Sequence, residues 1–401
     1  MVGRTPRSAA DAPVGSSPFS SEMIPHHMQA AVYRGNSVVS IDTIDTPAIG
    51  PGEILIRVEA CGVCHTDLKK IEYNLLTPPR IYGHETAGVV ALVGSNVTRF
   101  KPGDRVIVFH HIPCGQCFYC RRKLYAQCPV YKKVGVTAGF EPAGGGFSQY
   151  VRVMDWIVER GVEIIPDDVP FEIAAFVEPL NTCLKAVEQC DPQPGDVVLV
   201  QGQGPIGLLF TMLLNLRGCT IVATDTIPRR LELSKLCGAH FALDPRTANA
   251  PGTLRELTSG RGADIVFVAT NVKGLVEEAV SSSRPGAKIM LFAQTSDKER
   301  IELSGASICV GERSLLGSYS ASVDIQKESA ALVFGGKLPL NLLISHRVPL
   351  DKIEFAFRLA THPGEFPGEN PLKIIVRPHD SAADTPEAGS QEFAGFRTNA
   401  G

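Results

Sequence analysis

Apolar residues follow two different patterns along the chain, and the first half shows the alternation that is typical of β-strands. Short stretches there follow the pattern of strands that bury one face, and turns such as Pro102-Gly103-Asp104 separate them. This spacing predicts a small, barrel-like β domain. The stretches lie at residues 29–33, 54–60, 87–93, 105–109 and 147–153.

The pattern changes near Gly195. Continuous apolar stretches now alternate with segments of helical length, which predicts an α/β domain built on a doubly wound parallel sheet. Beyond residue 320, a helix at 325–334 and strands at 345–348 and 372–376 are expected to rejoin the β domain. The six candidate parallel strands lie at residues 196–201, 219–224, 241–243, 264–268, 288–292 and 314–318.

Two domains and two tails follow from these patterns, and a chain of 401 residues is also long for one core. We expect a β-rich domain at residues 28–190, to which residues 321–378 return, and an α/β domain at residues 191–320. Residues 1–27 and 379–401 show no periodicity and are expected to be disordered tails. The first tail lacks the apolar core of a signal peptide.

Composition and charge narrow the class of protein. Hydrophobic residues at 44% and charged residues at 20% are typical of a globular chain. The net charge of −3 offers no attraction to nucleic acid or to an anionic membrane, and the longest apolar run, residues 206–216, is too short to cross a bilayer. Eleven cysteines, an odd number in a large chain, argue against a disulfide framework and for a reducing, cytoplasmic location.

Four clustered cysteines form the first candidate metal site. The spacing Cys114-x2-Cys117-x2-Cys120-x7-Cys128 supplies four thiolates, which close a tetrahedral site with no open position, as a structural zinc needs. A nucleic-acid-binding knuckle is the rival use of such a loop, and the basic residues at 121–123 and 132–133 lend it slight support. A few charges on a loop are more often a solvated face, so the pattern predicts structural zinc.

The second candidate site combines Cys61-Gly-Val-Cys-His-Thr-Asp67 with Gly83-His-Glu85. A thiolate and an imidazole suit zinc, and a catalytic zinc keeps one position open for water or substrate. We expect Cys64, His84 and one further protein group as its ligands. Taken alone, the Cys-x-x-Cys spacing is also typical of a redox pair or of two buried thiols.

A glycine-rich turn, Gly202-Gln-Gly204-Pro205-Ile206-Gly207, lies between an apolar strand and an apolar helix, and Asp225 ends the next strand. This arrangement is what a dinucleotide site requires, because the glycines permit the turn and the close approach of a pyrophosphate to the helix N-terminus. An α/β domain without a nucleotide is the alternative. The Asp225 carboxylate accepts the ribose hydroxyls of NAD but repels the 2′-phosphate of NADP, so the sequence predicts NAD; Arg229 and Arg230 soften this preference.

Glu178 lies in the segment Phe176-Val-Glu-Pro-Leu180, whose proline predicts a helix start near residue 179. From local sequence alone, Glu178 is a carboxylate favoured by the positive end of that helix. The cysteines outside the two candidate sites are expected to be small buried hydrophobes. They are Cys61, Cys183, Cys190, Cys219, Cys237 and Cys309.

In combination, these motifs resemble those of the zinc-dependent medium-chain alcohol dehydrogenases over residues 28–378, in particular the sorbitol, threonine and other polyol-type members. The resemblance implies a GroES-like catalytic domain at 28–190 with 321–378 and a Rossmann domain at 191–320. It also implies a catalytic zinc on Cys64 and His84, with Glu85 as an alternate or neighbouring ligand and Asp67 orienting the imidazole. Glu178 takes the position of the third ligand, which is a cysteine in the ethanol-type members, and is expected to be a neighbour of the zinc, either directly or through water.

The resemblance implies a mechanism as well. Zinc acts as a Lewis acid on the substrate hydroxyl, Thr66 takes the alcohol proton, and the substrate carbon gives hydride to NAD. Lys69 stands where relatives often carry a relay histidine, so the proton is expected to leave through His65, Lys69 or solvent. Lys373 matches a basic position near the pyrophosphate, with a structural role as the alternative. The expected cofactor-binding residues are Gly202, Gly204, Pro205, Ile206, Gly207, Asp225, Arg230 and Lys373.

The substrate is the least determined part of the prediction. His110 and His111 fall near the substrate pocket by the same analogy and hint at a hydroxylated molecule. A secondary alcohol or polyol is the first expectation, and an amino alcohol such as L-threonine is the second. Two other classes stay open: a zinc-free NAD(P)H reductase of enones or quinones, and a nucleotide-binding sensor without turnover. The family forms dimers or tetramers, so we expect a homo-oligomer without a nucleic-acid or membrane partner.

Overall fold

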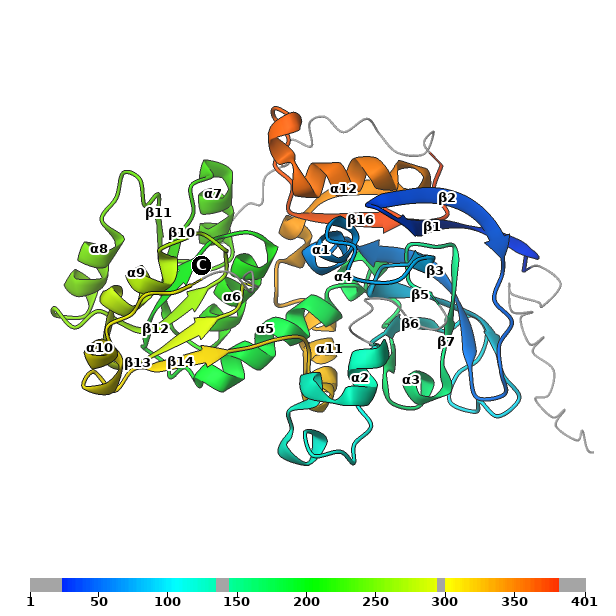
Figure 1. The fold of residues 1–401 in the computed structure, drawn as a ribbon, viewed down its shortest axis with the longest axis horizontal. Coiled ribbons are helices and arrows are strands. Elements are labelled where there is room, and N and C mark those ends of the chain that lie inside the picture. The colour runs from blue at the N-terminus through cyan, green and yellow to red at the C-terminus, as the bar shows by residue number, and fades with distance from the viewer. Residues whose placement is uncertain (1–23, 135–143, 294–299, 382–401) are drawn as a thin grey trace, which may run out of the picture.

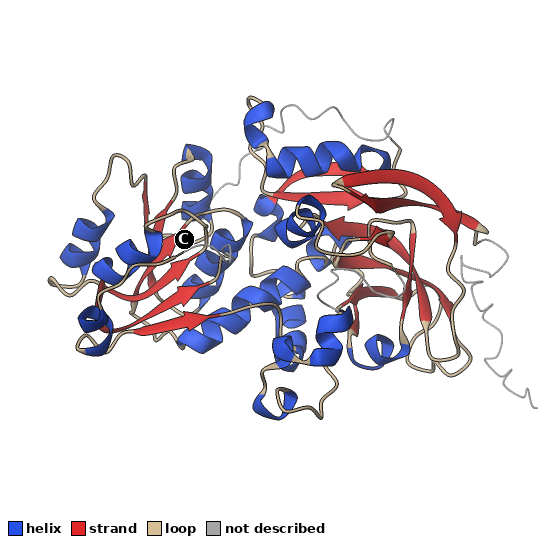
Figure 2. Cartoon of the chain, in the orientation of Figure 1, coloured by secondary structure: helices blue, strands red, loops and turns tan. Residues whose placement is uncertain are grey.

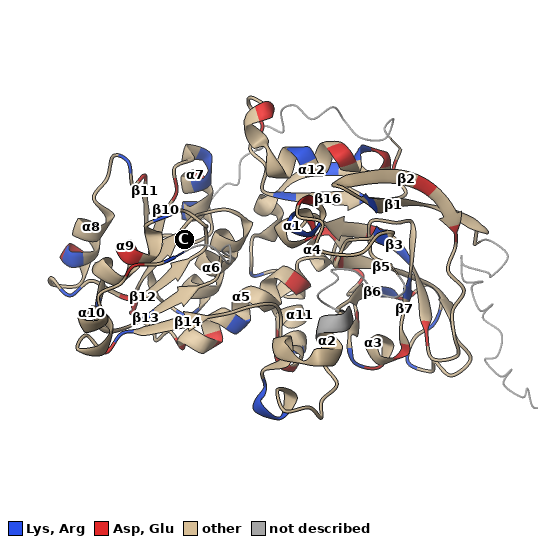
Figure 3. Ribbon diagram, in the orientation of Figure 1, with Lys and Arg blue, Asp and Glu red and all other residues tan. Residues whose placement is uncertain are grey.

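The computed structural model describes residues 24–134, 144–293 and 300–381, and both predicted tails fall largely outside these ranges. Two halves, each built around β-sheets, lie beside one another in Figure 1, with the α/β half at the left. Acidic and basic residues are interspersed over both halves in the view of Figure 3. Within the described ranges, no helix has the length and apolar character needed to cross a membrane.

The α/β half contains a six-stranded parallel sheet in the order β11-β10-β9-β12-β13-β14. Counted from its own first strand, this order is 3-2-1-4-5-6, which is the doubly wound arrangement predicted from the sequence. All six predicted strands are present, although β13 begins at Ser283 rather than at residue 288. They are β9 (Val197–Gln201), β10 (Thr220–Thr224), β11 (Phe241–Leu243), β12 (Ala263–Val268), β13 (Ser283–Leu291) and β14 (Ser314–Gly317).

Helices cover both faces of this sheet (Figure 2). Successive residues of β9 point to opposite faces, so Val198 and Val200 pack with Leu208 of α6 in one core, while Val197 and Leu199 pack under α8 and α9 in another. Both faces are therefore buried, which explains the continuous apolar strands of this half. The helices are α6 (Pro205–Leu216), α7 (Pro228–Leu236), α8 (Ala250–Leu257), α9 (Leu275–Ser282) and α10 (Gly305–Cys309).

The other half holds a seven-stranded, mostly antiparallel sheet and a smaller three-stranded sheet. The larger sheet follows the order β15-β16-β3-β5-β6-β8, and β7 pairs with β3. Two strands from the end of the chain thus join the sheet made by its first half, while the domain boundaries themselves stay a prediction. The larger sheet contains β3 (Ile54–Gly62), β5 (Glu85–Val93), β6 (Arg105–Val108), β7 (Tyr150–Val153), β8 (Val162–Ile164), β15 (Ile344–Pro349) and β16 (Lys373–Arg377), and the smaller one β1 (His27–Gly35), β2 (Val38–Asp45) and β4 (Arg80–Ile81).

One helix of the β-rich half reaches both sheets. α5 (Val177–Cys190) contacts β13 and β14 of the six-stranded parallel sheet and β5 of the seven-stranded sheet, so this helix joins the two halves. Glu178 is its second residue, and the predicted helix start near residue 179 is confirmed within two residues. The remaining helices are α1 (His65–Glu72), α2 (Pro129–Val134), α3 (Asp155–Arg160), α4 (Phe171–Ala174), α11 (Gln326–Phe334) and α12 (Ile353–Thr361), with short 3₁₀ turns η2 (Cys120–Arg122), η3 (Tyr125–Gln127), η5 (Val323–Ile325), η6 (Leu340–Leu343), η7 (Leu350–Lys352) and η8 (Pro363–Glu365).

Candidate active site

The four clustered cysteines come together on an excursion of the β-rich half, which we call the four-cysteine lobe (residues 114–134). The four sulfur atoms all lie within 4.8 Å of one another; they belong to Cys114, Cys117, Cys120 and Cys128. The sulfurs of Cys117 and Cys120 are 3.4 Å apart, too far for a disulfide bond. Backbone N–H groups of Gln116 and Cys117 lower the pKa of Cys114 to about 6, which favours its thiolate. Four sulfur donors in this arrangement fit a closed tetrahedral zinc site.

The second cluster gathers Cys64, His84 and Glu85, whose ligand atoms also lie within 4.8 Å of one another. The antiparallel register of β3 and β5 makes this possible, because it sets Gly62 opposite Glu85. Cys64 lies two residues after β3 and directly precedes α1, while His84 directly precedes β5. Sulfur, nitrogen and oxygen donors from two adjoining strand ends therefore converge, and the set fits a zinc ion.

Asp67 holds the His84 ring. Oδ1 of Asp67 lies 3.0 Å from Nδ1 of His84, and both side chains are buried. An imidazole that donates Nδ1–H to this carboxylate turns its Nε2 lone pair toward a ligand, as in carboxylate–histidine–zinc arrangements. Burial acts to lower the pKa of His84, but the charges of Asp67 and Cys64 raise it well above its usual value. The surroundings therefore favour a cation at this position.

Glu85 pairs with the predicted cofactor residue Lys373. The Lys373 amine donates to both carboxylate oxygens at 2.7 and 2.6 Å and to the carbonyl of Val63 at 3.3 Å. A Cβ atom on Gly62 would lie 1.8 Å from Oε2 of Glu85, so the close approach of this carboxylate requires glycine at position 62. The structure thus places Lys373 beside the metal cluster, and its role at a pyrophosphate stays a prediction.

Glu178 lies outside the cluster of three, and its partner is His111. Oε1 of Glu178 is 2.7 Å from Nε2 of His111, and Nδ1 of the same ring is 2.7 Å from the hydroxyl of Tyr131. Burial raises the pKa of Glu178, and the charge of His84 acts on it in the opposite sense. Burial and the positive charges of His84, Lys70 and Lys185 lower the pKa of His111 well below its usual value, so its imidazole is neutral.

The two histidines predicted near the substrate border this cluster. The His110 ring centroid lies 5.6 Å from that of His84 and 4.1 Å from that of His111. Tyr131 and its neighbour Ser320, whose Oγ lies 3.0 Å from Nδ1 of His111, were not predicted from the sequence. Ser320 lies 209 residues from His111, and Tyr131, although only three residues after Cys128, belongs to no motif; both meet His111 only in the folded protein.

The glycine turn joins β9 to α6 as predicted. Gly202 has a φ of +90° and its N–H donates to the carbonyl of Thr224, while Gly204 caps α6 with Pro205 as first helical residue. Asp225 directly follows β10, and its carboxylate accepts the backbone N–H of Gln203 at 2.7 Å. The acidic residue is therefore bonded to the turn itself, beside the helix N-terminus at which the sequence predicts a pyrophosphate.

Arg230 places a positive charge beside this turn. A guanidinium nitrogen of Arg230 lies 3.9 Å from Oδ2 of Asp225, and its other one donates to the carbonyl of Pro371, next to β16, at 3.4 Å. The pKa of His65 is lowered mainly by desolvation of its ring and further by the positive charges of Lys373, Lys69 and Arg230. These contacts fit the two negative charges of a pyrophosphate.

Thr66 lies in the first turn of α1, two residues after Cys64, and is half-buried.

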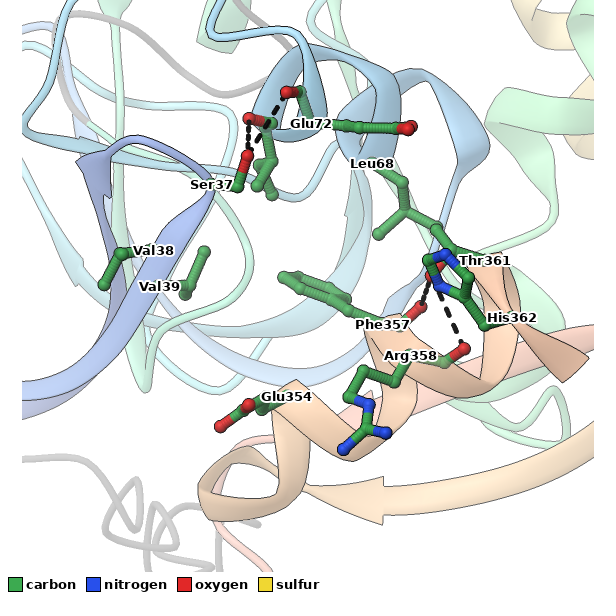
Figure 4. Close-up of a pocket in the computed structure, with 11 residues that line it drawn as sticks. Ser37, Val38, Val39, Leu68, Glu72, Glu354, Phe357, Arg358, Thr361 and His362 are labelled. Carbon is green, nitrogen blue, oxygen red and sulfur yellow. Dashed lines mark hydrogen bonds between the residues drawn. The ribbon is translucent and has the colours of Figure 1, made fainter. Parts of the chain in front are cut away.

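A cavity of about 390 Å³ lies between the β1–β2 turn, α1 and α12 (Figure 4). Leu68 and Ile71 of α1 line it together with Phe357 and Arg358 of α12, and no predicted site residue does. The cavity is therefore separate from the candidate active site.

Comparison with known proteins adds to this geometry. Residues 50–163 match the alcohol dehydrogenase GroES-like domain, and residues 205–334 match the zinc-binding dehydrogenase domain. The chain is 31% identical to a sorbitol dehydrogenase of Bacillus subtilis over 362 residues, which cover 89% of this chain and 99% of that relative. It is 31% identical to an L-threonine 3-dehydrogenase of Pyrococcus abyssi over 327 residues, 79% of this chain and 90% of that relative.

Solved structures share the fold. A putative zinc-binding dehydrogenase from Sinorhizobium meliloti, bound to NADP, superposes with a TM-score of 0.79 at 27% identity, covering 88% of this chain and 99% of that one. This chain is thus similar along most of its length to a zinc-binding dehydrogenase that binds a nicotinamide dinucleotide.

Proposed function

This chain belongs to the zinc-binding alcohol dehydrogenase family, and from that premise we propose that it oxidises a secondary alcohol or a polyol with NAD. It is an alcohol dehydrogenase whose cofactors are zinc and a nicotinamide dinucleotide. The observation that carries the proposal is the convergence of ligand atoms from Cys64, His84 and Glu85 in the same chain as a glycine turn bonded to Asp225.

We assign Cys64 and His84 as ligands of the catalytic zinc, with Glu85 as the nearest carboxylate. Bound there, zinc supplies Lewis acidity, which lowers the pKa of a hydroxyl in the open position. Asp67 fixes the imidazole through Nδ1, and Lys373 balances the charge of Glu85. Glu178 is close enough for its charge to act on Glu85, and we assign it as the carboxylate that faces the substrate side.

We assign the first proton transfer to Thr66. Its hydroxyl, in the first turn of α1, can accept a hydrogen bond from an alcohol and donate one outward, so it is suited to pass a proton. The ring of His65, which directly precedes Thr66, and the amine of Lys69, one turn further along α1, are the expected routes to solvent. The catalytic set we propose is Cys64, Thr66, His84, Glu85 and Glu178.

The choice of NAD over NADP rests on Asp225. At about 4 Å and an effective dielectric near 20, each charge pair between its carboxylate and a 2′-phosphate costs on the order of 4 kcal/mol, and a third of that is about tenfold in affinity. We expect kcat/KM with NAD to exceed that with NADP by about tenfold or more, and Asp225→Ser to narrow the ratio. Glu232→Gln removes an acid that pairs with Arg229 on α7 and should leave the ratio unchanged. Equal values for the two cofactors in the unmodified enzyme would overturn the choice.

A panel of alcohols with metal analysis tests the function as a whole. We expect two zinc ions per chain and NADH production with sorbitol or another polyol. The second candidate substrate is an amino alcohol, supported by the similarity to the threonine dehydrogenase, so L-threonine belongs in the panel. Full activity after chelation would favour a zinc-free reductase, and dinucleotide binding without turnover on any panel member would favour a sensor.

We also propose that the enzyme is a homo-oligomer. β14 forms one outer edge of the parallel sheet, where Leu315 and the nearby Val310 are 38% and 82% exposed. An apolar edge strand invites pairing with a second copy. Size-exclusion chromatography with light scattering should show a dimer or tetramer, and Leu315→Lys should shift it toward the monomer. Leu257→Lys, equally exposed at 38% on α8, is the matched control. A monomeric unmodified protein would contradict the proposal.

A cytoplasmic location completes the proposal. All eleven cysteines are free thiols; of the six predicted to be small buried hydrophobes, five are buried, and the prediction is wrong for Cys309, which is exposed. Thiolate ligands need a reducing compartment to stay reduced, which supports this location.

A further inference from the structure

Three side chains link Glu178 to a distant part of the chain. Oε1 of Glu178 is 2.7 Å from Nε2 of His111, and Nδ1 of His111 is 2.7 Å from the Tyr131 hydroxyl and 3.0 Å from Oγ of Ser320. Glu178, His111 and Tyr131 are all buried, at 7%, 6% and 4% exposed. In such a site each hydrogen bond is worth more than at the surface, so the arrangement constrains the carboxylate.

The two hydroxyls decide which nitrogen of His111 carries its proton. A neutral imidazole has one N–H and one lone pair. A hydroxyl that donates to Nδ1 leaves the proton on Nε2, which then donates to Glu178. With the other tautomer, the Nε2 lone pair would face a carboxylate oxygen. The hydroxyls of Tyr131 and Ser320 also contact each other. One of them can therefore donate to Nδ1 of His111 while it accepts a hydrogen bond from the other hydroxyl.

The four-cysteine lobe sets the position of Tyr131. His111 lies three residues before Cys114, and Tyr131 lies three residues after Cys128. The backbone N–H of Cys114 donates to the sulfur of Cys128 at 3.4 Å, so the two ends of the lobe meet. The Tyr131 ring packs in one cluster with Cys120 and Cys128. Closure of the cysteine cluster therefore brings the tyrosine hydroxyl to the His111 ring.

Ser320 is held by contacts with α5, the helix whose second residue is Glu178. Lys185 of α5 donates to the carbonyl of Tyr319 at 2.9 Å, and Asn181 exchanges two hydrogen bonds with the backbone of Ser322 at 2.7 and 3.0 Å. The helix thus fixes the segment that carries Ser320, whose hydroxyl reaches back to His111. Both hydroxyl partners of His111 are held by contacts independent of Glu178.

We propose that Tyr131 and Ser320 are positioning residues, which act through His111 to aim the carboxylate of Glu178, and that the four-cysteine lobe holds Tyr131 in place for this task. The proposal rests on the proposed function, because it gives a buried carboxylate near the catalytic zinc a defined direction. It assigns the lobe a role in the geometry of the active site in addition to its role in local stability.

The double variant Tyr131→Phe/Ser320→Ala tests this, since either hydroxyl alone can still select the tautomer. We expect kcat/KM for the best alcohol to fall about tenfold, the lower end of the range for residues that orient metal-site groups, while the Kd for NADH stays unchanged. With cobalt(II) in the catalytic site, we expect its visible absorption spectrum to shift. His111→Phe should give the same two changes, and combining all three substitutions should add nothing further.

The matched control is Tyr33→Phe/Ser37→Ala. Tyr33 is a buried tyrosine with a 2.7 Å hydrogen bond to Asn74, and Ser37 has a φ of +62° against +61° for Ser320. If the test variant and this control agree in kcat/KM and in the cobalt spectrum, the positioning role is overturned. Additive effects of His111→Phe would also overturn it. A cobalt shift in a chain that turns over no alcohol would instead leave the positioning role standing and remove the proposed function.

Discussion

Replacing Cys64 by serine should lower kcat/KM by about 10³-fold and reduce the zinc content from two ions per chain to one. Cys64 supplies the only sulfur to the cluster with His84 and Glu85, and a serine hydroxyl is a poor substitute for a thiolate ligand. Lewis-acid catalysis contributes several kcal/mol, and about 4 kcal/mol corresponds to a 10³-fold change in rate. Steady-state kinetics with the best alcohol, together with elemental analysis of the purified protein, measure both effects.

Cys61→Ala is the control, because Cys61 belongs to the same Cys-x-x-Cys spacing but not to the cluster. Its sulfur is buried and lies 3.6 Å from the hydroxyl of Thr86, and burial raises its pKa. We expect this variant to keep two zinc ions and to lose less than about threefold in kcat/KM, since a small cavity affects stability more than chemistry. Two retained zinc ions and near-normal activity in Cys64→Ser would show that Cys64 is not a ligand.

Period and spacing were sufficient to predict the parallel sheet. Its central strands β9, β10 and β12 are largely buried on both faces and form continuous apolar stretches, and the strand order follows from the doubly wound rule. The β-rich half was harder, because its short strands have weaker signals: β2, with Ile41 and Val38 exposed, was not predicted. An exposed edge strand carries little of the alternation on which the prediction depends.

The metal motifs were visible in the sequence because their ligands are close together along it. The sequence did not show which other residues contact each ligand in the folded protein. Lys373 meets Glu85 across 288 residues, and Ser320 meets His111 across 209. The first pair forms because β16, near the end of the described chain, joins the seven-stranded sheet beside β3. The second forms because α5 packs against the segment that carries Ser320. They depend on tertiary packing, which local patterns do not encode.

Substituting the glycines of the turn should separate dinucleotide binding from stability. A Cβ atom at Gly204 would have Arg230 as its nearest neighbour, at 4.0 Å, so Gly204→Ala should fold normally. The methyl group would, however, occupy the place where a pyrophosphate approaches the backbone. Steric overlap of this kind costs up to about 3 kcal/mol, so we expect the Kd for NADH to rise about 100-fold in isothermal titration.

Gly207→Ala should behave differently, because its Cβ would lie 1.8 Å from the carbonyl oxygen of Gly202. Helix α6 must then move away from β9, so both the melting temperature and NADH affinity should fall. Gly364→Ala, with no atom within 4 Å of the added Cβ, should change neither quantity. The space around residue 204 is open, so the added methyl group can lower NADH affinity only by meeting the dinucleotide. Normal NADH affinity in Gly204→Ala would therefore place the dinucleotide away from this turn.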